Sequence, residues 1–149
     1  MIEGLSRNQL AIGAAVALLL VVVIVFLAMR GGGGDSSVRD QVLADVEAIR
    51  AHELDHKNIF GDYIAADAAP RAPHLVNGDA VAWEPTRGFE RLSWEPSDPA
   101  EVRGSYSVVL EPDGFRVIGV SDADADGKVA RVEATAGEAA HLVTSQDVY

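Results

Sequence analysis

The chain has 149 residues, enough for one modest domain and accessory segments. Its formal net charge of −11 argues against an electrostatic nucleic-acid binder, because phosphate recognition depends on clustered Lys and Arg, and we expect no nucleic-acid partner. The absence of cysteine excludes disulfides, thiolate metal sites and cysteine nucleophiles.

A long apolar segment lies near the N-terminus: LAIGAAVALLLVVVIVFLAM, residues 10–29, carries no charge. About 20 apolar residues match the thickness of a bilayer, whereas the apolar core of a signal peptide has about 7–15 and ends at a cleavage site. We therefore predict an N-terminal tail at 1–9 and a single transmembrane anchor at 10–30, with the lipid bilayer as one partner. The flanking charges favour a cytoplasmic N-terminus and therefore an exported C-terminal domain.

Four consecutive glycines, Gly31 to Gly34, follow the anchor, and their conformational freedom predicts a flexible linker over residues 31–36. Beyond the linker, apolar residues recur at the spacing of one helix face. They are Val38, Val42, Val46 and Ile49, with Leu43 and Leu54 widening the stripe. This pattern predicts one amphipathic helix from about residue 37 to residue 58.

Turn-forming residues interrupt the segment 61–99 so often that we predict no long helix or strand in it. The interruptions are Pro70, Pro73, Asn77-Gly78, Pro85, Pro96 and Pro99. Aromatic side chains are spread through the same region, and we expect their rings to pin an irregular connection onto the helix and the sheet. These aromatic residues are Phe60, Tyr63, Trp83, Phe89 and Trp94.

The last third of the chain predicts strands, because β-branched and aromatic residues alternate between turn signals. The expected strands are VRGSYSVVL at 102–110, FRVIGVS at 115–121 and KVARVEAT at 128–135. HLVTSQDVY, residues 141–149, is a fourth strand or a closing tail. The predicted class is α+β: residues 37–149 form an exported domain in which the amphipathic helix packs on a small antiparallel β-meander.

The predicted helix contains HELDH, residues 52–56, which matches the H-E-x-x-H spacing of zinc helices. A catalytic zinc needs a third protein ligand, and neither of the other histidines stands at a recognised spacing. We therefore favour a solvated helix face in which Glu53 pairs with Lys57. The alternatives are a structural metal site and a membrane-anchored zinc hydrolase that uses His52, Glu53 and His56.

An acidic loop, DADADG at residues 122–127, is followed after five residues by Glu133, which is the spacing of a calcium-binding loop. Alternating oxygen ligands can surround a hard cation, and the glycine permits a sharp turn. We predict calcium as the cofactor, with the aspartates favoured over Glu133 because strands and not helices flank the loop. The predicted ligands are Asp122, Asp124, Asp126, Lys128 and Glu133. The alternative is a solvated turn without metal.

Three stretches carry a family resemblance. VLADVEAIRAHELDHKNIFGDYI leads into a Gly-x-Tyr, and GFERLSWEPSDPAEVRGSYSV contains Phe-x-x-Leu-x-Trp-x-Pro and then Arg-x-Ser-Tyr. GFRVIGVSDADADGKVARVEA places an Asp-rich loop between two strands, and the chain ends in DVY. Over about residues 38–149 the chain thereby resembles type IV pilin-like and pseudopilin-like proteins.

The resemblance implies a non-enzymatic, single-pass envelope protein that is a minor subunit or accessory of a type IV pilus or a type II secretion-like apparatus. It also implies a protein of the bacterial inner membrane whose C-terminal domain is periplasmic or extracellular. Its partners would be other envelope, pilus or secretion proteins, and self-assembly is left open. The N-terminus departs from the prepilin motif, because Gly4-Leu5 mimics the cleavage junction while Gln9 stands where prepilins have Glu. An envelope tether or sensor that binds a protein partner is the alternative.

Overall fold

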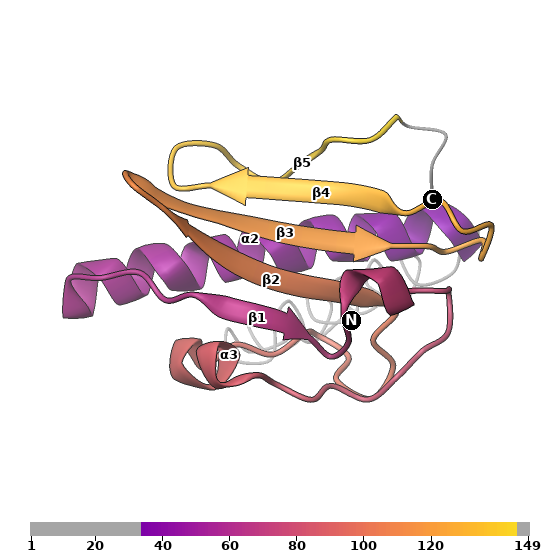
Figure 1. Ribbon diagram of the computed structural model, residues 1–149, viewed down its shortest axis with the longest axis horizontal. Helices are drawn as coiled ribbons and strands as arrows, with labels where there is room; N and C mark the ends of the chain where they lie inside the picture. The colour runs from indigo at the N-terminus through magenta and orange to yellow at the C-terminus, as the bar shows by residue number, and fades with distance from the viewer. Residues whose placement is uncertain (1–33, 146–149) are drawn as a thin grey trace, which may run out of the picture. The chain divides into compact units, whose positions relative to one another are not determined.

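The computed structural model describes residues 34–145, in which one long helix packs against a five-stranded antiparallel sheet (Figure 1). The elements are α2 Gly34–Phe60, β1 Ala66–Ala69, η1 Pro73–Leu75, α3 Arg87–Leu92, β2 Gly104–Glu111, β3 Gly114–Ser121, β4 Ala130–Thr135 and β5 His141–Leu142. The strands lie in the order β1-β2-β3-β4-β5, so each strand pairs with its sequence neighbour. The predicted α+β class, a helix on an antiparallel meander, is confirmed.

The predicted membrane anchor, residues 10–30, lies outside the described residues, as do the tail at 1–9 and the first part of the linker. Between residues 34 and 145, no helix combines the length and the apolar character needed to cross a membrane.

Helix α2 begins at Gly34, three residues earlier than predicted, so the last part of the expected linker is helical. A glycine costs least at a helix end, where the first backbone N–H groups have no intrahelical acceptor in any case. Most of the predicted apolar stripe faces the sheet, and Val42, Val46 and Ile49 are buried against it, whereas Leu43, which was predicted to widen the stripe, is 37% exposed. Gly119 of β3 permits the close approach, because a Cβ atom there would lie 2.5 Å from Val46 Cγ2.

The two faces of the sheet have different chemistry. Tyr106, Gly119 and Val132 share a register position across β2, β3 and β4, and they lie on the face covered by α2. On the opposite face Glu133 accepts hydrogen bonds from Arg116 Nη1 and Arg131 Nε, both at 2.6 Å. One face therefore belongs to the core and the other carries an ionic network.

The connection between α2 and β2 contains three short elements that the sequence did not predict, β1, η1 and α3. Strand β1 pairs with β2, with Ala66 opposite Val108 and Ala69 opposite Tyr106. Helix α3 then packs on β1, and Gly88 allows this contact because a Cβ atom there would lie 2.3 Å from the Ala65 carbonyl oxygen. The prediction that no long element forms in 61–99 is confirmed, since β1 has 4 residues and α3 has 6.

Aromatic rings fasten this connection to the rest of the domain, as expected. The Trp83 and Trp94 rings lie 6.3 Å and 5.4 Å from the ring of Tyr106 in β2. The Tyr106 hydroxyl donates a 2.7 Å hydrogen bond to the buried Asp45 carboxylate of α2. Burial raises the pKa of Asp45, and the hydrogen bond from Tyr106 opposes that rise. Phe60, in contrast, is 69% exposed at the end of α2.

Candidate metal centre

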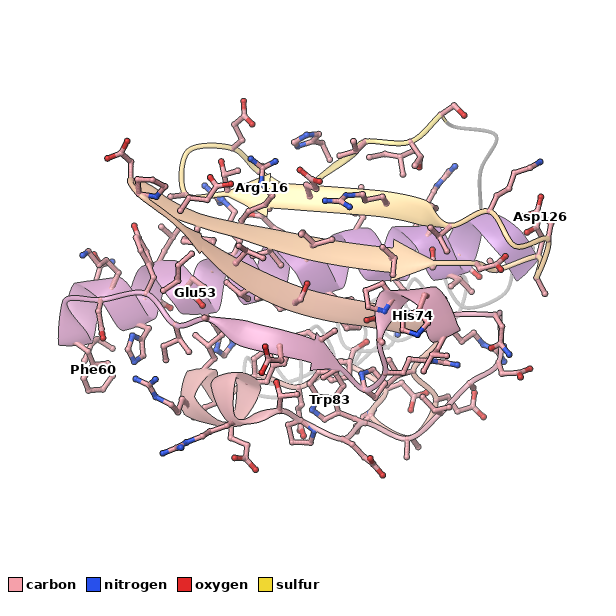
Figure 2. The ribbon with its side chains drawn as sticks, viewed as in Figure 1. Glu53, Phe60, His74, Trp83, Arg116 and Asp126 are labelled. Carbon is pink, nitrogen blue, oxygen red and sulfur yellow. The ribbon has the colours of Figure 1, made fainter. Side chains whose placement is uncertain are left out.

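The loop between β3 and β4 gathers three carboxylates at one end of the domain. One oxygen each from Asp122, Asp124 and Asp126 lie within 4.8 Å of one another. Figure 2 shows Asp126 at the opposite end of the domain from Phe60. The three aspartates that the D-x-D-x-D-G spacing singled out are therefore brought together.

The local sequence fixes the shape of the loop. The Asp122 carboxylate accepts hydrogen bonds from the backbone N–H groups of Asp126, at 3.2 Å, and Gly127, at 3.1 Å. Ala125 and Gly127 have φ angles of 57° and 84°, so the chain turns twice through the left-handed region. Glycine takes that conformation without a steric penalty, which explains the Gly at the sharp turn.

The electrostatics of the loop favour a cation. Asp122 is buried while Asp124 and Asp126 are exposed. The backbone N–H of Lys128 donates a 2.8 Å hydrogen bond to Asp126 and holds the pKa of that carboxyl below its usual value. The Lys128 ammonium lies 3.3 Å from Asp126 Oδ2, so one positive charge faces three negative ones.

The spacing of the oxygens fits a calcium ion. Calcium binds six to eight oxygens at about 2.3–2.6 Å, so two ligands on opposite sides of the ion lie about 5 Å apart. The three carboxylates, within 4.8 Å of one another, satisfy this limit. Oxygen ligands alone also favour a hard cation over zinc, which prefers imidazole and thiolate. Backbone carbonyls and water would complete the coordination.

Glu133, the most distant predicted ligand, is not gathered with the aspartates. It lies within β4, and its two oxygens accept the hydrogen bonds from Arg116 and Arg131 described above. Burial acts to raise the pKa of Glu133, but the two arginines outweigh it and the pKa is lowered. The carboxylate is therefore charged and already neutralised, so the cluster of carboxylates is smaller than the calcium-loop pattern predicts.

A second turn packs against the aspartate loop. A Cβ atom on Gly78 would lie 2.9 Å from the Asp122 carbonyl oxygen, so the Asn77-Gly78-Asp79 turn touches the loop. Arg103 Nη1 donates a 2.6 Å hydrogen bond to the Gly78 carbonyl, and Asn77 Nδ2 donates one to Asp79. The Asn-Gly pair signalled a turn, but no pattern in the sequence placed it beside the aspartates.

Of the HELDH residues, His52 and Asp55 are exposed, as the solvated face predicted, but Glu53 is not. Glu53 is fully buried, and its Oε2 accepts a 2.9 Å hydrogen bond from the Ile64 backbone N–H. The predicted ion pair with Lys57 is wrong, because Glu53 points into the core and Lys57 donates to the Gly61 carbonyl. Glu53 Oε1 has no hydrogen-bond partner among the described residues.

The two histidines of HELDH each face a backbone carbonyl. His52 Nδ1 lies 3.1 Å from the Leu92 oxygen and His56 Nδ1 lies 2.9 Å from the Asp62 oxygen. Across residues 34–145, the aspartate loop is the one place where three potential metal-ligating side chains come together. The described part of the chain therefore supplies HELDH with no third ligand for a catalytic zinc.

Comparisons of the chain with protein-family models, with curated proteins and with solved structures gave no match. The aspartate loop therefore stands as a candidate site on its own geometry and charge.

We expect calcium to raise the melting temperature of the chain relative to a chelator, because a ligand that binds only the folded state stabilises it. Stabilisation would be about 2.7 kcal/mol at a calcium concentration 100 times Kd. Asp124→Asn should abolish the difference, whereas Asp113→Asn, at the turn between β2 and β3, should preserve it. Circular dichroism melting curves with calcium and with EDTA measure the effect, and identical native curves would contradict a calcium site.

Proposed function

We propose that the chain is a non-enzymatic, single-pass, pilin-like protein of the bacterial cell envelope, a minor subunit or accessory of a type IV pilus or a type II secretion-like apparatus. In this proposal residues 10–30 anchor it in the inner membrane with the N-terminus in the cytoplasm. The domain that follows lies in the periplasm or outside the cell and contacts other envelope proteins.

The observation that carries the proposal is the arrangement of α2. This long helix follows the apolar segment 10–29 in the chain and packs along one face of a sequential antiparallel sheet (Figure 1). An apolar helix continued by an amphipathic helix on a small meander is the layout on which the resemblance to pilin-like proteins rests. The three quoted motifs fall within the same domain, in α2, in α3 with the start of β2, and in the β3–β4 pair.

Calcium has a structural role in this proposal. The aspartate loop joins β3 to β4, the two strands on which α2 mainly packs. A cation held by Asp122, Asp124 and Asp126 would remove their mutual repulsion and fix the loop that connects the two strands. Calcium would thereby stiffen the domain without taking part in a reaction.

The first test of the proposal is the location and topology of the full chain in a bacterial host. We expect the protein to remain in the membrane fraction after alkaline carbonate washing and to need detergent for release. A C-terminal epitope should be digested by protease added to spheroplasts. Release by carbonate, or protection of the epitope, would contradict the anchored and exported arrangement.

The second test concerns the apparatus. In a host that makes type IV pili and carries the chain's own gene, we expect the protein to appear in sheared filaments or to cross-link to a pilus or secretion component. Membrane anchorage with neither outcome would favour a plain envelope tether over a pilus or secretion subunit.

A further inference from the structure

A groove of about 510 Å³ lies beside α3 on an aromatic floor. Its lining includes Trp83, Phe89 and Trp94, and the two indole rings are perpendicular, with centroids 5.3 Å apart. Phe89 and Trp94 are buried, whereas Trp83 is partly exposed and gives the groove its accessible ring. Figure 2 shows Trp83 below the sheet in that view, on the side of α3 and away from Arg116 and Asp126.

Two carboxylates, Glu90 and Glu95, line the same groove, and no basic side chain lines it. Both are exposed, and within residues 34–145 neither forms an ion pair. Elsewhere in the domain, Glu47, Glu111 and Glu133 are each paired with an arginine. The groove therefore holds two negative charges that the domain leaves without a counter-charge.

Helix α3 keeps its own arginines out of this groove. Arg87 stands three residues before Glu90, a spacing at which side chains on a helix can pair, yet no ion pair joins them. Arg87 and Arg91 line a separate cavity together with Asp67. The helix thus separates its charges, with the acid in the aromatic groove and the bases outside it.

The chemistry of the groove selects a cation. An ammonium or guanidinium is attracted to the face of a tryptophan within about 6 Å of the ring centre, and arginine also stacks on aromatic faces. Carboxylates beside the ring add charge-assisted hydrogen bonds. The chain itself has a net charge of −11, so the surrounding field also favours a basic partner and opposes a second copy of this chain.

We propose that the groove lined by Trp83 and Trp94 binds an arginine or lysine side chain of a protein partner. Glu90 and Glu95 hold the charge, and the partly exposed ring of Trp83 packs against the side chain. The volume of about 510 Å³ lies within the 300–1,000 Å³ of typical ligand sites, so the groove holds a basic side chain and its flanking residues. This assignment deepens the proposed envelope function by giving the chemistry of the partner.

The test uses the full chain in dodecyl maltoside micelles, because this detergent has an uncharged head group. The probe is the peptide acetyl-Gly-Pro-Arg-Pro-Gly-amide, and its matched control carries citrulline, which has nearly the shape of arginine without the charge. Trp83 and Trp94 are the 2 tryptophans of the chain, so intrinsic fluorescence reports on this groove directly. We expect a saturable change with the arginine peptide and about tenfold weaker binding of the citrulline peptide.

Charge removal inside and outside the groove gives a second readout. Glu90→Gln/Glu95→Gln should weaken the arginine peptide about tenfold and should reduce the dependence of binding on salt. Asp113→Asn/Glu138→Gln removes two exposed carboxylates elsewhere and should leave the affinity within about twofold. All four substituted side chains are exposed, so the melting temperatures of both double variants should match that of the native chain.

Three outcomes would overturn the assignment. Equal binding of the arginine and citrulline peptides would show that the groove does not recognise the charge. Equal weakening by both double variants would show that the peptide is attracted by the overall negative charge of the protein and not by Glu90 and Glu95. Binding of tetramethylammonium chloride without binding of the arginine peptide would assign the groove to a small quaternary amine or a choline head group. None of these outcomes bears on membrane anchorage or filament association, so the proposed function fails or stands separately.

Discussion

Glu53→Gln is expected to be more stable than the native chain by about 2–3 kcal/mol at pH 8 and nearly equal to it at pH 4. Burial raises the pKa of Glu53 from the ordinary 4.5 to about 7, while the hydrogen bond from Ile64 and the charge of His56 act in the opposite direction. Asp62 adds a smaller upward contribution. The amide of glutamine keeps an oxygen for the Ile64 N–H and cannot ionise.

The sign follows from proton uptake. Between pH 4.5 and 7 the folded chain holds a proton on Glu53 that the unfolded chain has lost, so the contribution of Glu53 to stability is fully present below pH 4.5 and is lost as the pH rises to 7. The gap between the two pKa values corresponds to about 3 kcal/mol. Above pH 7 the folded chain must hold a buried charge with one oxygen, Oε1, lacking a partner.

Urea unfolding of residues 34–149 from pH 4 to pH 8 measures the effect as a difference between variant and native chain. Asp55→Asn removes an exposed carboxyl two residues away on α2 and is the matched control for the loss of one charge. A Glu53→Gln curve parallel to the native curve at every pH would contradict a carboxyl buried in neutral form. In the zinc hydrolase alternative, the same substitution would abolish an activity while zinc is retained.

Gly88→Ala is expected to destabilise the domain by about 2–4 kcal/mol, although alanine is a better helix former than glycine by about 1 kcal/mol. The added Cβ would lie 2.3 Å from the Ala65 carbonyl oxygen and 2.5 Å from the Ala66 Cα. Both are backbone atoms, so no side-chain rotation relieves the contact. Helix α3 would have to move away from β1, which would also disturb the aromatic cluster around Phe89.

Gly137→Ala is the matched control, because a Cβ atom on Gly137 meets nothing within 4 Å. Thermal or urea unfolding of the two variants beside the native chain separates the close contact from the general effect of replacing a glycine. Stabilisation of both variants would show that α3 is not held against β1 at the described distance.

The main elements could be predicted because their signals are local. The apolar residues of α2 recur at the spacing of one helix face, which is visible in the sequence. Pro112-Asp113-Gly114 marks the turn between β2 and β3. Strand β1 could not be predicted, because Ala-Asp-Ala-Ala has low strand propensity and becomes a strand only by pairing with β2. Helix α3 lies between two proline-containing stretches and has too few residues for a periodic signal.

In the candidate site, too, the local signals predicted the structure and the contacts between distant residues did not. The alternating aspartates are close in sequence and come together, whereas Glu133 accepts a hydrogen bond from Arg116 of the neighbouring strand β3. Glu53 was assigned to a solvated face because it is charged. Its spacing indicates a buried position, because Glu53 stands seven residues after Val46 and four after Ile49 and so lies on the same face of the helix. For this residue, helix position was a better guide than residue type.

The sequential order of the strands has a consequence for synthesis. Each strand pairs with the one made just before or after it, so the hairpins can form as the chain emerges, starting with β2 and β3. Helix α2 is made first but packs mainly on β3 and β4, which end at Thr135. A nascent chain that has not passed Ser121, the end of β3, lacks the strand on which Val46 packs. Helix α2 is thus synthesised first but is covered by its strands only late in synthesis. During this interval its apolar face is a binding site for a chaperone.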